Sequence, residues 1–446
     1  MISLEKLEEL LENKKLIEVK KILEEMNEYD IASLIQELPD DLLIQVFRLL
    51  SKDIAVDVFV NLDDEVQRKL IASLTKKEAK YIIEDMFSDD AADLFEEMPA
   101  MLVTSLLSNV DKETRNDINI LLKYPDNSAG SLMAVEYIHL KMGLTIKESI
   151  ERIRKQKDDF VSYDSCFVTD DKRKLLGRVS VKDLLINEPS CLIDDIMEEC
   201  EHSISTLTDQ EDVAKCFQDY DYSTLPVVDS ENRLVGVITI DDVVDIMEEE
   251  ATEDIAKMAA TTPTEKPYLK SSLWDIYKSR MPWLLFLMIS ATFTSGIISG
   301  FESSLASCAV LTLFMPMIMG TGGNAGGQAS ATIIRALSLD EVKFKDIFRV
   351  LLKESIIAIL CGLTLAICNF VKLLLFDKVE VLIAFVICLS LFLTILLAKI
   401  IGAILPILAD KIHLDPAVMA NPLITTIVDA GSLLVYFKVA SIILGL

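Results

Sequence analysis

The sequence predicts a multi-domain protein: an all-α superhelical domain, an α/β pair of repeats, a connecting acidic helix and an all-α membrane domain of five spans. Three observations lead to this fold class: unevenly distributed charge, two internal repeats and a series of long apolar segments. Residues 281–446 contain ten acidic and ten basic side chains, so the net charge of −28 belongs entirely to residues 1–280. Such acidity argues against nucleic acid as a partner, because phosphates need a basic surface, and favours cations.

The first 128 residues repeat a helical phrase. It reads DIASLIQELPDD at 30–41, DIAVDVFVNLDDE at 53–65 and EAKYIIEDMFSDD at 78–90, a period of 23–25 residues. A period of this length is typical of stacked helix pairs. We therefore expect residues 1–128 to form a small superhelical domain.

A second repeat follows, in which residues 168–185 align with residues 227–244 at a constant offset of 59. Each copy predicts the order strand, helix, strand, turn, strand, helix, over residues 129–190 and 191–245. Ser180 and Thr239 each precede a helix by one residue, with an acidic residue three positions later, which is a helix-capping pattern. The phrases GRVSVKD, ending at Asp183, and GVITIDD resemble the signature of CBS (cystathionine β-synthase) domains. This resemblance implies a cleft for an adenine nucleotide such as ATP, with these candidate residues: Ser180, Asp183, Tyr222 and Thr239.

The segment after the second repeat is a helix crowded with carboxylates. Its acidic candidates are Asp242, Asp245, Glu249, Glu250, Glu253 and Asp254. Like charges four residues apart destabilise a helix by a few tenths of a kcal/mol per pair, about 0.2–0.5. Divalent cations that bridge these side chains to Asp209, Glu211 and Asp221 would relieve the repulsion. Residues 246–272 then connect the repeats to the membrane domain, 273–446.

Five membrane spans are predicted near residues 281–300, 305–334, 350–376, 380–408 and 417–444, because about 20 apolar residues cross a bilayer. Basic residues precede the first span and gather between the second and third, whereas the other links lack such an excess. By the positive-inside rule, the N-terminal half is cytoplasmic and the C-terminus lies outside.

Two spans contain polar features. Residues 316–330, PMIMGTGGNAGGQAS, include five glycines that permit either close helix packing or a locally unwound helix with free carbonyls. In the last span, Asn421, Thr425 and Asp429 recur at i, i+4 and i+8 and so project from one helix face. A carboxylate in a membrane costs roughly 2.5–3.5 kcal/mol or more, which favours a function. A cation path, an interhelical hydrogen bond and a proton relay all fit, and Asp415 together with Asp429 leaves an intramembrane aspartyl hydrolase as an alternative.

The whole chain resembles the MgtE family of magnesium channels or transporters. The resemblance is carried by TGGNAGGQ at 321–328, DPAVMANPLITTIVDAG at 415–431 and EEEATEDI at 248–255. It implies a non-enzymatic homodimer in the bacterial inner membrane, which transports Mg²⁺ and closes when cytosolic Mg²⁺ moves the acidic connecting helix, the plug helix, against the pore. It also makes Asp429 the ion-selecting residue. The implied pore residues are Asp429, Asn421, Asp415 and Thr425, and the implied sensor residues are Asp89, Asp90, Asp93, Asp209, Glu211, Asp221, Asp242, Asp245, Glu250, Glu253 and Asp254.

Other functions remain open from the residues alone. An oxygen-lined path would also accept cobalt, manganese or nickel. A CBS-gated anion or solute transporter and a membrane-anchored energy sensor without transport belong to different classes. The acid-lined path disfavours the first, and the polar stripe with the glycine run disfavours the second.

Overall fold

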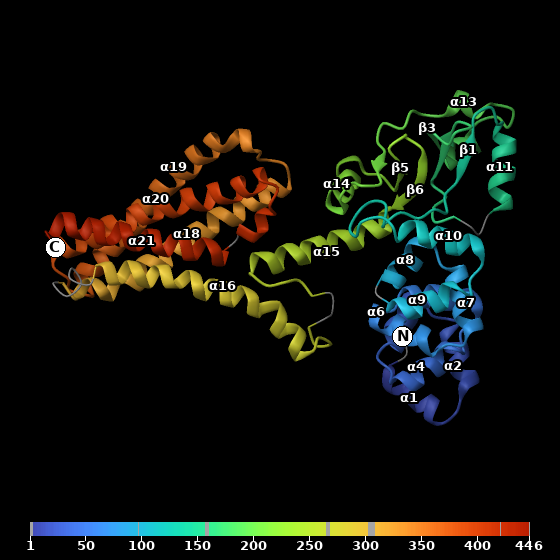
Figure 1. Cartoon of the computed structure of the whole chain (residues 1–446), viewed down its shortest axis with the longest axis horizontal. Coiled ribbons are helices and arrows are strands. Elements are labelled where there is room, and N and C mark those ends of the chain that lie inside the picture. Colours follow the sequence, from blue (N-terminus) through green and yellow to red (C-terminus); the bar gives the residue numbers. More distant parts are fainter. Residues whose placement is uncertain are drawn as a thin grey trace. The chain divides into compact units, whose positions relative to one another are not determined.

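A computed structural model describes residues 3–96, 98–156, 160–264, 268–301, 308–419 and 421–445, without the side chains of Asp53 and Asn421. The chain forms two compact units, residues 1–248 and 249–446 (Figure 1). The boundary between these units falls within a single helix, α15 (Ile240–Met258).

The N-terminal domain consists of short helices that stack in two rows. Helices α3, α5, α7 and α9 contact one another in succession, and α4, α6, α8 and α10 do the same. This alternation confirms the predicted stacking of helix pairs. The helices are α1 (Leu4–Glu12), α2 (Leu16–Leu23), α3 (Glu28–Ile35), α4 (Asp40–Phe47), α5 (Lys52–Val60), α6 (Asp64–Ser73), α7 (Lys76–Asp85), α8 (Ser88–Glu96), α9 (Ala100–Leu107) and α10 (Lys112–Leu121).

Local sequence explains where these helices begin. Pro39 and Pro99 stand immediately before α4 and α9, where the missing N–H of proline removes no helical hydrogen bond. The Thr75 side chain caps α7 in a reciprocal capping box with Glu78. One apolar cluster runs through the domain, and its burial stabilises helices that are too short to persist alone.

Each CBS repeat forms a three-stranded sheet flanked by helices, in the predicted order. In the first, β1 pairs parallel with β2 and β2 pairs antiparallel with β3; β4, β5 and β6 repeat this arrangement. A shared apolar cluster contains side chains of both repeats. The elements are β1 (His139–Lys141), α11 (Ile146–Lys155), β2 (Ser165–Thr169), β3 (Leu175–Ser180), α12 (Val181–Ile186), α13 (Ile193–Ile196), β4 (Ile204–Ser205), α14 (Gln210–Tyr220), β5 (Thr224–Val228), β6 (Leu234–Thr239) and α15.

The glycine at the start of each CBS phrase has a steric reason. A Cβ on Gly177 would lie 2.4 Å from the Glu198 carbonyl oxygen, and one on Gly236 would lie 2.6 Å from Met133 Sδ. Both glycines therefore allow a neighbouring segment to approach the strand closely.

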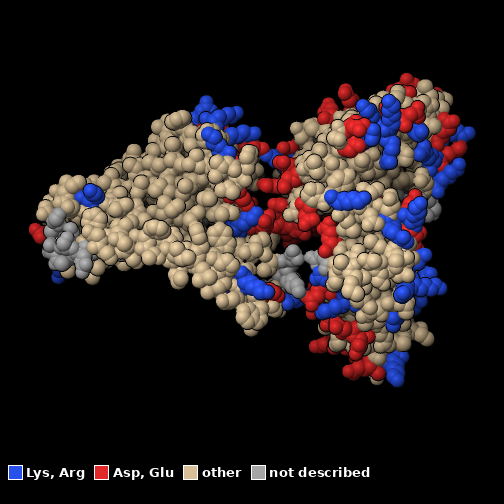
Figure 2. Space-filling model, viewed as in Figure 1, with Lys and Arg blue, Asp and Glu red and all other residues tan. Residues whose placement is uncertain are grey.

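The second unit is a bundle of long helices: α16 (Leu273–Gly300), α18 (Val310–Ser338), α19 (Ile347–Leu375), α20 (Val381–Lys411) and α21 (Asn421–Leu444), with the short η1 (Phe344–Asp346) and η2 (Pro416–Met419). Among the described residues, four segments are long and apolar enough to cross a membrane: those that contain α16, α19, α20 and α21. Figure 2 shows that the visible surface of this bundle is largely free of charged side chains.

Helix α18 has 29 residues but is not one of those four, because it contains the glycine run with Asn324 and Gln328. It packs against both α20 and α21. Tyr436 Oη of α21 donates a hydrogen bond to the Leu311 carbonyl at 2.9 Å, and Ser330 Oγ donates to the Met419 carbonyl at 3.2 Å. Because α18 packs between α20 and α21, its polar residues can face other helices and need not face lipid.

Candidate functional site

The glycine run of α18 is a helix-packing surface. The helix is unbroken from Val310 to Ser338, so the interpretation of an unwound helix is wrong and that of close packing is confirmed. A Cβ on Gly323 would lie 2.9 Å from Thr425 Cγ2, and one on Gly402 of α20 would lie 2.3 Å from the Gly326 carbonyl oxygen. Only glycine lets the three helices α18, α20 and α21 approach this closely.

The predicted polar stripe lies on one helix. Asn421, Thr425 and Asp429 all belong to α21, as their spacing requires, although the side chain of Asn421 lies outside the described residues. Asp429 is partly buried, and its Oδ1 atom is buried without a hydrogen-bond partner in the described part of the chain. A buried carboxylate oxygen without a donor is unfavourable unless a cation or a proton approaches it.

Two hydroxyl oxygens near Gly322 are also buried without a hydrogen-bond partner among the described residues. Thr394 Oγ1 of α20 and Ser432 Oγ of α21 are buried and have no hydrogen-bond partner among the described residues. A Cβ on Gly322 would lie 2.7 Å from Thr394 Cγ2 and 2.8 Å from Ser432 Oγ. The junction of α18, α20 and α21 therefore holds two buried hydroxyls that have no hydrogen-bond partner among the described residues. The sequence did not identify Thr394 or Ser432.

A buried ion pair connects α19 and α20. Lys399 Nζ lies 3.6 Å from Glu354 Oε2, and the two side chains are 7% and 9% exposed. In the sequence, Glu354 and Lys399 are two of the ten acidic and ten basic residues of the segment 281–446, and nothing there links them to each other. Their pairing depends on helix packing, so a linear pattern gave no signal for it.

The end of the acidic helix contacts the segment that precedes α21. Lys257 of α15 forms ion pairs with Asp415 and Glu253, both at 2.6 Å. Burial opposes protonation of Lys257, but its hydrogen bonds to Asp415 and Glu253 outweigh burial and raise its pKa. Burial, followed by the charge of Asp415, raises the pKa of Asp254. The structure thus brings together Asp415, Glu253 and Asp254, with the Lys257 ammonium between two of the carboxylates.

A second group of carboxylates lies in the first unit, where α8, the segment before β1 and the start of α15 meet. We call Asp89, Asp90, Glu136 and Asp242 the acidic cluster. Burial raises the pKa of Asp90 to about 7, with further contributions from Asp242, Asp241 and Glu136. Burial, then the charges of Asp90 and Asp242, raises the pKa of Asp89 well above its usual range. These shifts mean that burial, and then the mutual repulsion of the carboxylates, destabilises the ionised cluster.

Hydrogen bonds hold the acidic cluster in place. Glu136 Oε2 accepts from Ser88 Oγ at 2.8 Å and from the Val135 N–H at 3.1 Å. Thr239 Oγ1 donates to Asp242 Oδ2 at 2.6 Å. Burial raises the pKa of both carboxyls despite these bonds. Glu136 was not predicted as a sensor residue, because it stands alone in the sequence without a pattern.

The other predicted sensor residues lie on α8, α14 and α15 or at the ends of these helices. Asp93 and Glu250 belong to α8 and α15, respectively. Asp209 caps α14 by accepting from the Glu211 N–H at 3.0 Å, and Asp221 ends that helix with a φ of 53°. Burial, followed by Glu248 and Asp241, raises the pKa of Asp245, so the groups acting on it belong to its own helix. Within the described ranges, no set of three or more His, Cys, Asp or Glu has the geometry to hold a metal ion as it stands.

The candidate nucleotide residues combine capping with aromatic contacts. Ser180 Oγ accepts from the Asp183 N–H at 3.1 Å and donates to Asp183 Oδ2 at 2.5 Å, which confirms the capping pattern. Tyr222 lies under the Arg178 guanidinium at 5.1 Å, and its hydroxyl is 2.9 Å from His202 Nδ1. An arginine beside an aromatic ring is chemically suited to a phosphate and a base.

The fold and these residues define a membrane protein with a helical bundle, a CBS pair and a helical N-domain, in which a buried carboxylate oxygen of the bundle has no hydrogen-bond partner among the described residues. Family models agree for each part: MgtE, a divalent cation transporter, matches residues 315–439; the MgtE intracellular N domain matches 26–127; and the CBS domain matches 129–188 and 193–249.

The chain belongs to the MgtE family. It is 38% identical to the magnesium transporter MgtE of Thermus thermophilus over 75% of this chain and 74% of that protein. It is 34% identical to the magnesium transporter MgtE of Bacillus subtilis over 78% and 77%, respectively. Among solved structures, the cytosolic domain of the Mg²⁺ channel MgtE in complex with ATP is 34% identical, with a TM-score of 0.52, and covers 54% of this chain and 98% of that one.

Proposed function

We propose that this protein transports Mg²⁺ across a membrane and that the Asp429 carboxylate selects the ion. The observation that carries the proposal is the buried Oδ1 of Asp429, which has no hydrogen-bond partner among the described residues and lies on the same helix as Thr425, inside the segment that resembles divalent cation transporters. Mg²⁺ dehydrates reluctantly and is usually held by one or two carboxylates and several waters. A single carboxylate per chain, with hydroxyls nearby, suits a largely hydrated ion.

The proposed assembly is a homodimer in the bacterial inner membrane. All five helices α16, α18, α19, α20 and α21 cross the bilayer, the N-terminal half is cytoplasmic and the C-terminus lies outside. Two copies of α21 then face each other, and their Asp429 side chains form a ring of two charges around the ion. The relatives named as magnesium transporters support the cargo, and the apolar helices support the bilayer location.

Regulation is proposed to act through the carboxylates outside the membrane helices. The acidic cluster repels itself when ionised, so Mg²⁺ that binds there would stabilise the contact of the N-domain with the CBS repeats. Mg²⁺ bound near Asp415, Glu253 and Asp254 would in the same way stabilise one position of the plug helix. The raised pKa values at both places support this role. ATP is proposed to bind near Arg178 and Tyr222, because the similar cytosolic domain was solved with ATP.

The experiment that tests transport is Mg²⁺ flux into proteoliposomes that contain an internal magnesium-sensitive dye. Asp429→Ala is expected to reduce flux to the level of protein-free liposomes, whereas Glu341→Gln, an exposed control in the same unit, retains it. Wild-type flux in Asp429→Ala would overturn the proposal.

A second candidate is a transporter of other divalent ions, since cobalt, manganese and nickel also accept oxygen ligands. Adding cobalt, manganese or nickel as a competitor in the same flux assay distinguishes a transporter of Mg²⁺ from a transporter of these other ions. The intramembrane aspartyl hydrolase is disfavoured, because Asp415 is bound to Lys257 and to the Ala417 N–H.

A further inference from the structure

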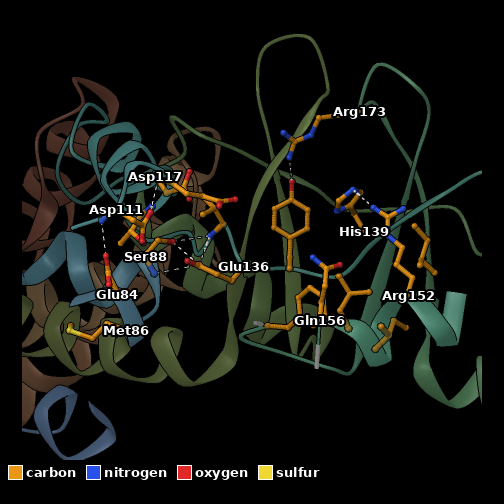
Figure 3. A pocket seen from close by; sticks show the side chains of 18 residues that line it. Glu84, Met86, Ser88, Asp111, Asp117, Glu136, His139, Arg152, Gln156 and Arg173 are labelled. Carbon is orange, nitrogen blue, oxygen red and sulfur yellow. Dashed lines mark hydrogen bonds between the residues drawn. The ribbon is translucent and has the colours of Figure 1, made fainter. Parts of the chain in front are cut away.

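A cavity of about 550 Å³ in the first unit lies between the N-domain and the first CBS repeat. Its walls carry opposite charge. Figure 3 shows Asp111 and Asp117 on one side and His139, Arg152 and Arg173 on the other. The cavity is separate from the Ser180 and Tyr222 region, since neither of those residues lines it.

The basic wall combines three elements of the first CBS repeat. Arg152 Nη2 of α11 lies 3.1 Å from His139 Nε2 of β1, and Arg173 Nη2, from the turn between β2 and β3, donates to Tyr137 Oη at 2.5 Å. Burial, then the charges of Arg152, Arg173 and Lys141, lowers the pKa of His139. Within the described ranges, neither Arg152 nor Arg173 forms an ion pair with a carboxylate. Among the described residues, no bound carboxylate therefore neutralises these two guanidinium groups.

The acidic wall comes mainly from the N-domain. Asp111 Oδ1 caps α10 by accepting from the Glu113 N–H at 2.7 Å, and Glu84 Oε1 accepts from the Asp111 N–H at 2.7 Å. Asp117 also lines the cavity, and burial followed by the charges of Glu113 and Asp111 raises its pKa. This wall would repel a free anion, just as the opposite wall would repel a free cation.

We propose that this cavity binds a magnesium-chelated phosphate anion, with its phosphate groups toward Arg152 and Arg173 and its metal toward Asp117 and the neighbouring carboxylates. Guanidinium groups match phosphate oxygens in charge and geometry. Mg²⁺ completes its shell with carboxylates, waters and substrate phosphates. Only the chelate complements both walls at once, and a cavity of this volume suits a small ligand.

Occupancy would connect two structural domains. The ligand would bridge α10 of the N-domain to β1 and α11 of the CBS repeat, beside Ser88 and Glu136, which also line the cavity. Because Glu136 belongs to the acidic cluster as well, the phosphate ligand and divalent cations would act on the same boundary. The site would let a phosphorylated metabolite stabilise the contact that the acidic cluster opposes.

Histidine resonances of the full-length protein in detergent provide a direct test. The chain has three histidines. After ¹³Cε1 labelling, His139 reports this cavity, His202 reports the region of Tyr222, and His413 serves as a reference in the second unit. The protein is titrated with pyrophosphate and equimolar Mg²⁺, with pyrophosphate and EDTA, and with MgCl₂ alone. The variant His139→Gln identifies the His139 signal by its loss.

The expected result is a saturable shift of the His139 signal with magnesium pyrophosphate, together with a rise of its pKa by about one unit as an anion neutralises its cationic neighbours. Arg152→Gln should weaken the apparent affinity at least tenfold. Arg154→Gln, an exposed residue on the same helix, should leave it unchanged. Unchanged His202 and His413 signals in the variants, together with an unchanged melting temperature, show that the fold is intact.

Four results would overturn the proposal. One is a His139 signal that does not respond at millimolar ligand. Another is equal affinity in Arg152→Gln and in the unmodified protein. The third is an equal response to MgCl₂ alone, which would make the effect one of metal binding elsewhere. Equal affinity with EDTA would overturn the role given to the acidic wall.

Discussion

The two compact units place their carboxylates in different ways. In residues 1–248, Asp89, Asp90, Glu136 and Asp242 lie close together, and burial followed by the charges of the other three carboxylates raises the pKa of Asp89. In residues 249–446, Glu354 is paired with Lys399 and Asp415 with Lys257, whereas Asp429 Oδ1 has no partner in the described part of the chain.

The difference follows from the surroundings. Water reaches the edge of the soluble unit, so several charges can share a site and respond together to pH or to cations. Inside a bilayer, a charged side chain is costly unless it is paired with an opposite charge or binds an ion. A cluster of carboxylates therefore suits the sensing of cations or pH, whereas a single carboxylate such as Asp429 suits the selection of one ion.

Breaking the Glu354–Lys399 pair should have the largest effect on stability. Glu354→Ala or Lys399→Ala leaves one buried charge without a partner and should destabilise the membrane unit by about 3–5 kcal/mol. The double variant should recover much of this loss. Thermal unfolding in detergent measures both quantities.

The exposed pair Asp340–Lys343 in the same unit is the matched control, with side chains 50% and 57% exposed. Neutralising either member should change stability by less than about 1 kcal/mol. If the buried and exposed pairs behaved alike, the distinction between individually neutralised and collective charges would fail.

The acidic cluster predicts a pH dependence of intermediate size. The folded-state pKa of Asp90 is raised to about 7, so folding favours its protonated form. Without divalent ions, the stability of the first unit should therefore fall as the pH rises from about 4 to 7 and level off above that. Asp90→Asn should flatten this decline and raise stability at pH 8 by about 1 kcal/mol or more, since one pKa unit corresponds to about 1.4 kcal/mol.

Mg²⁺ sharpens the same test. It should stabilise the unmodified protein more at pH 8 than at pH 5, and Asp90→Asn should reduce that gain. Asp41→Asn is the control: it is exposed in the first turn of α4, where its charge favours the helix, so its loss should lower stability slightly. A pH profile unchanged by Asp90→Asn would contradict the collective behaviour of the acidic cluster.

The smallest effect is expected for Lys257 and Asp415, whose side chains are 26% and 34% exposed. A double-mutant cycle with Lys257→Gln and Asp415→Asn should give a coupling free energy of about 0.2–1 kcal/mol, in the range of solvent-accessible pairs. A coupling as large as that of Glu354 and Lys399 would indicate that this contact is buried more deeply than its exposure suggests.

The sequence by itself determined the elements and their types. The period of the first repeat predicted the stacked helices and the offset of 59 predicted two equivalent sheets. Apolar length predicted the long helices of the second unit, four of which lie in segments apolar enough to cross a membrane in the described part of the chain. Each of these features follows from local periodicity and burial. The capping of α12 and the placement of Asn421, Thr425 and Asp429 on one helix were likewise predictable, because they depend on neighbours within a few residues.

Tertiary structure decided which distant groups meet. Glu136 joins Asp89 and Asp242, Lys399 joins Glu354, and Lys257 joins Asp415 across gaps that no local pattern encodes. It also decided between two interpretations of the glycine run, because whether a glycine unwinds a helix or admits a neighbour depends on what lies opposite. Here Gly323 lies against Thr425 and Gly326 against Ile424 and Val428, which brings the helix with Asp429 close to α18.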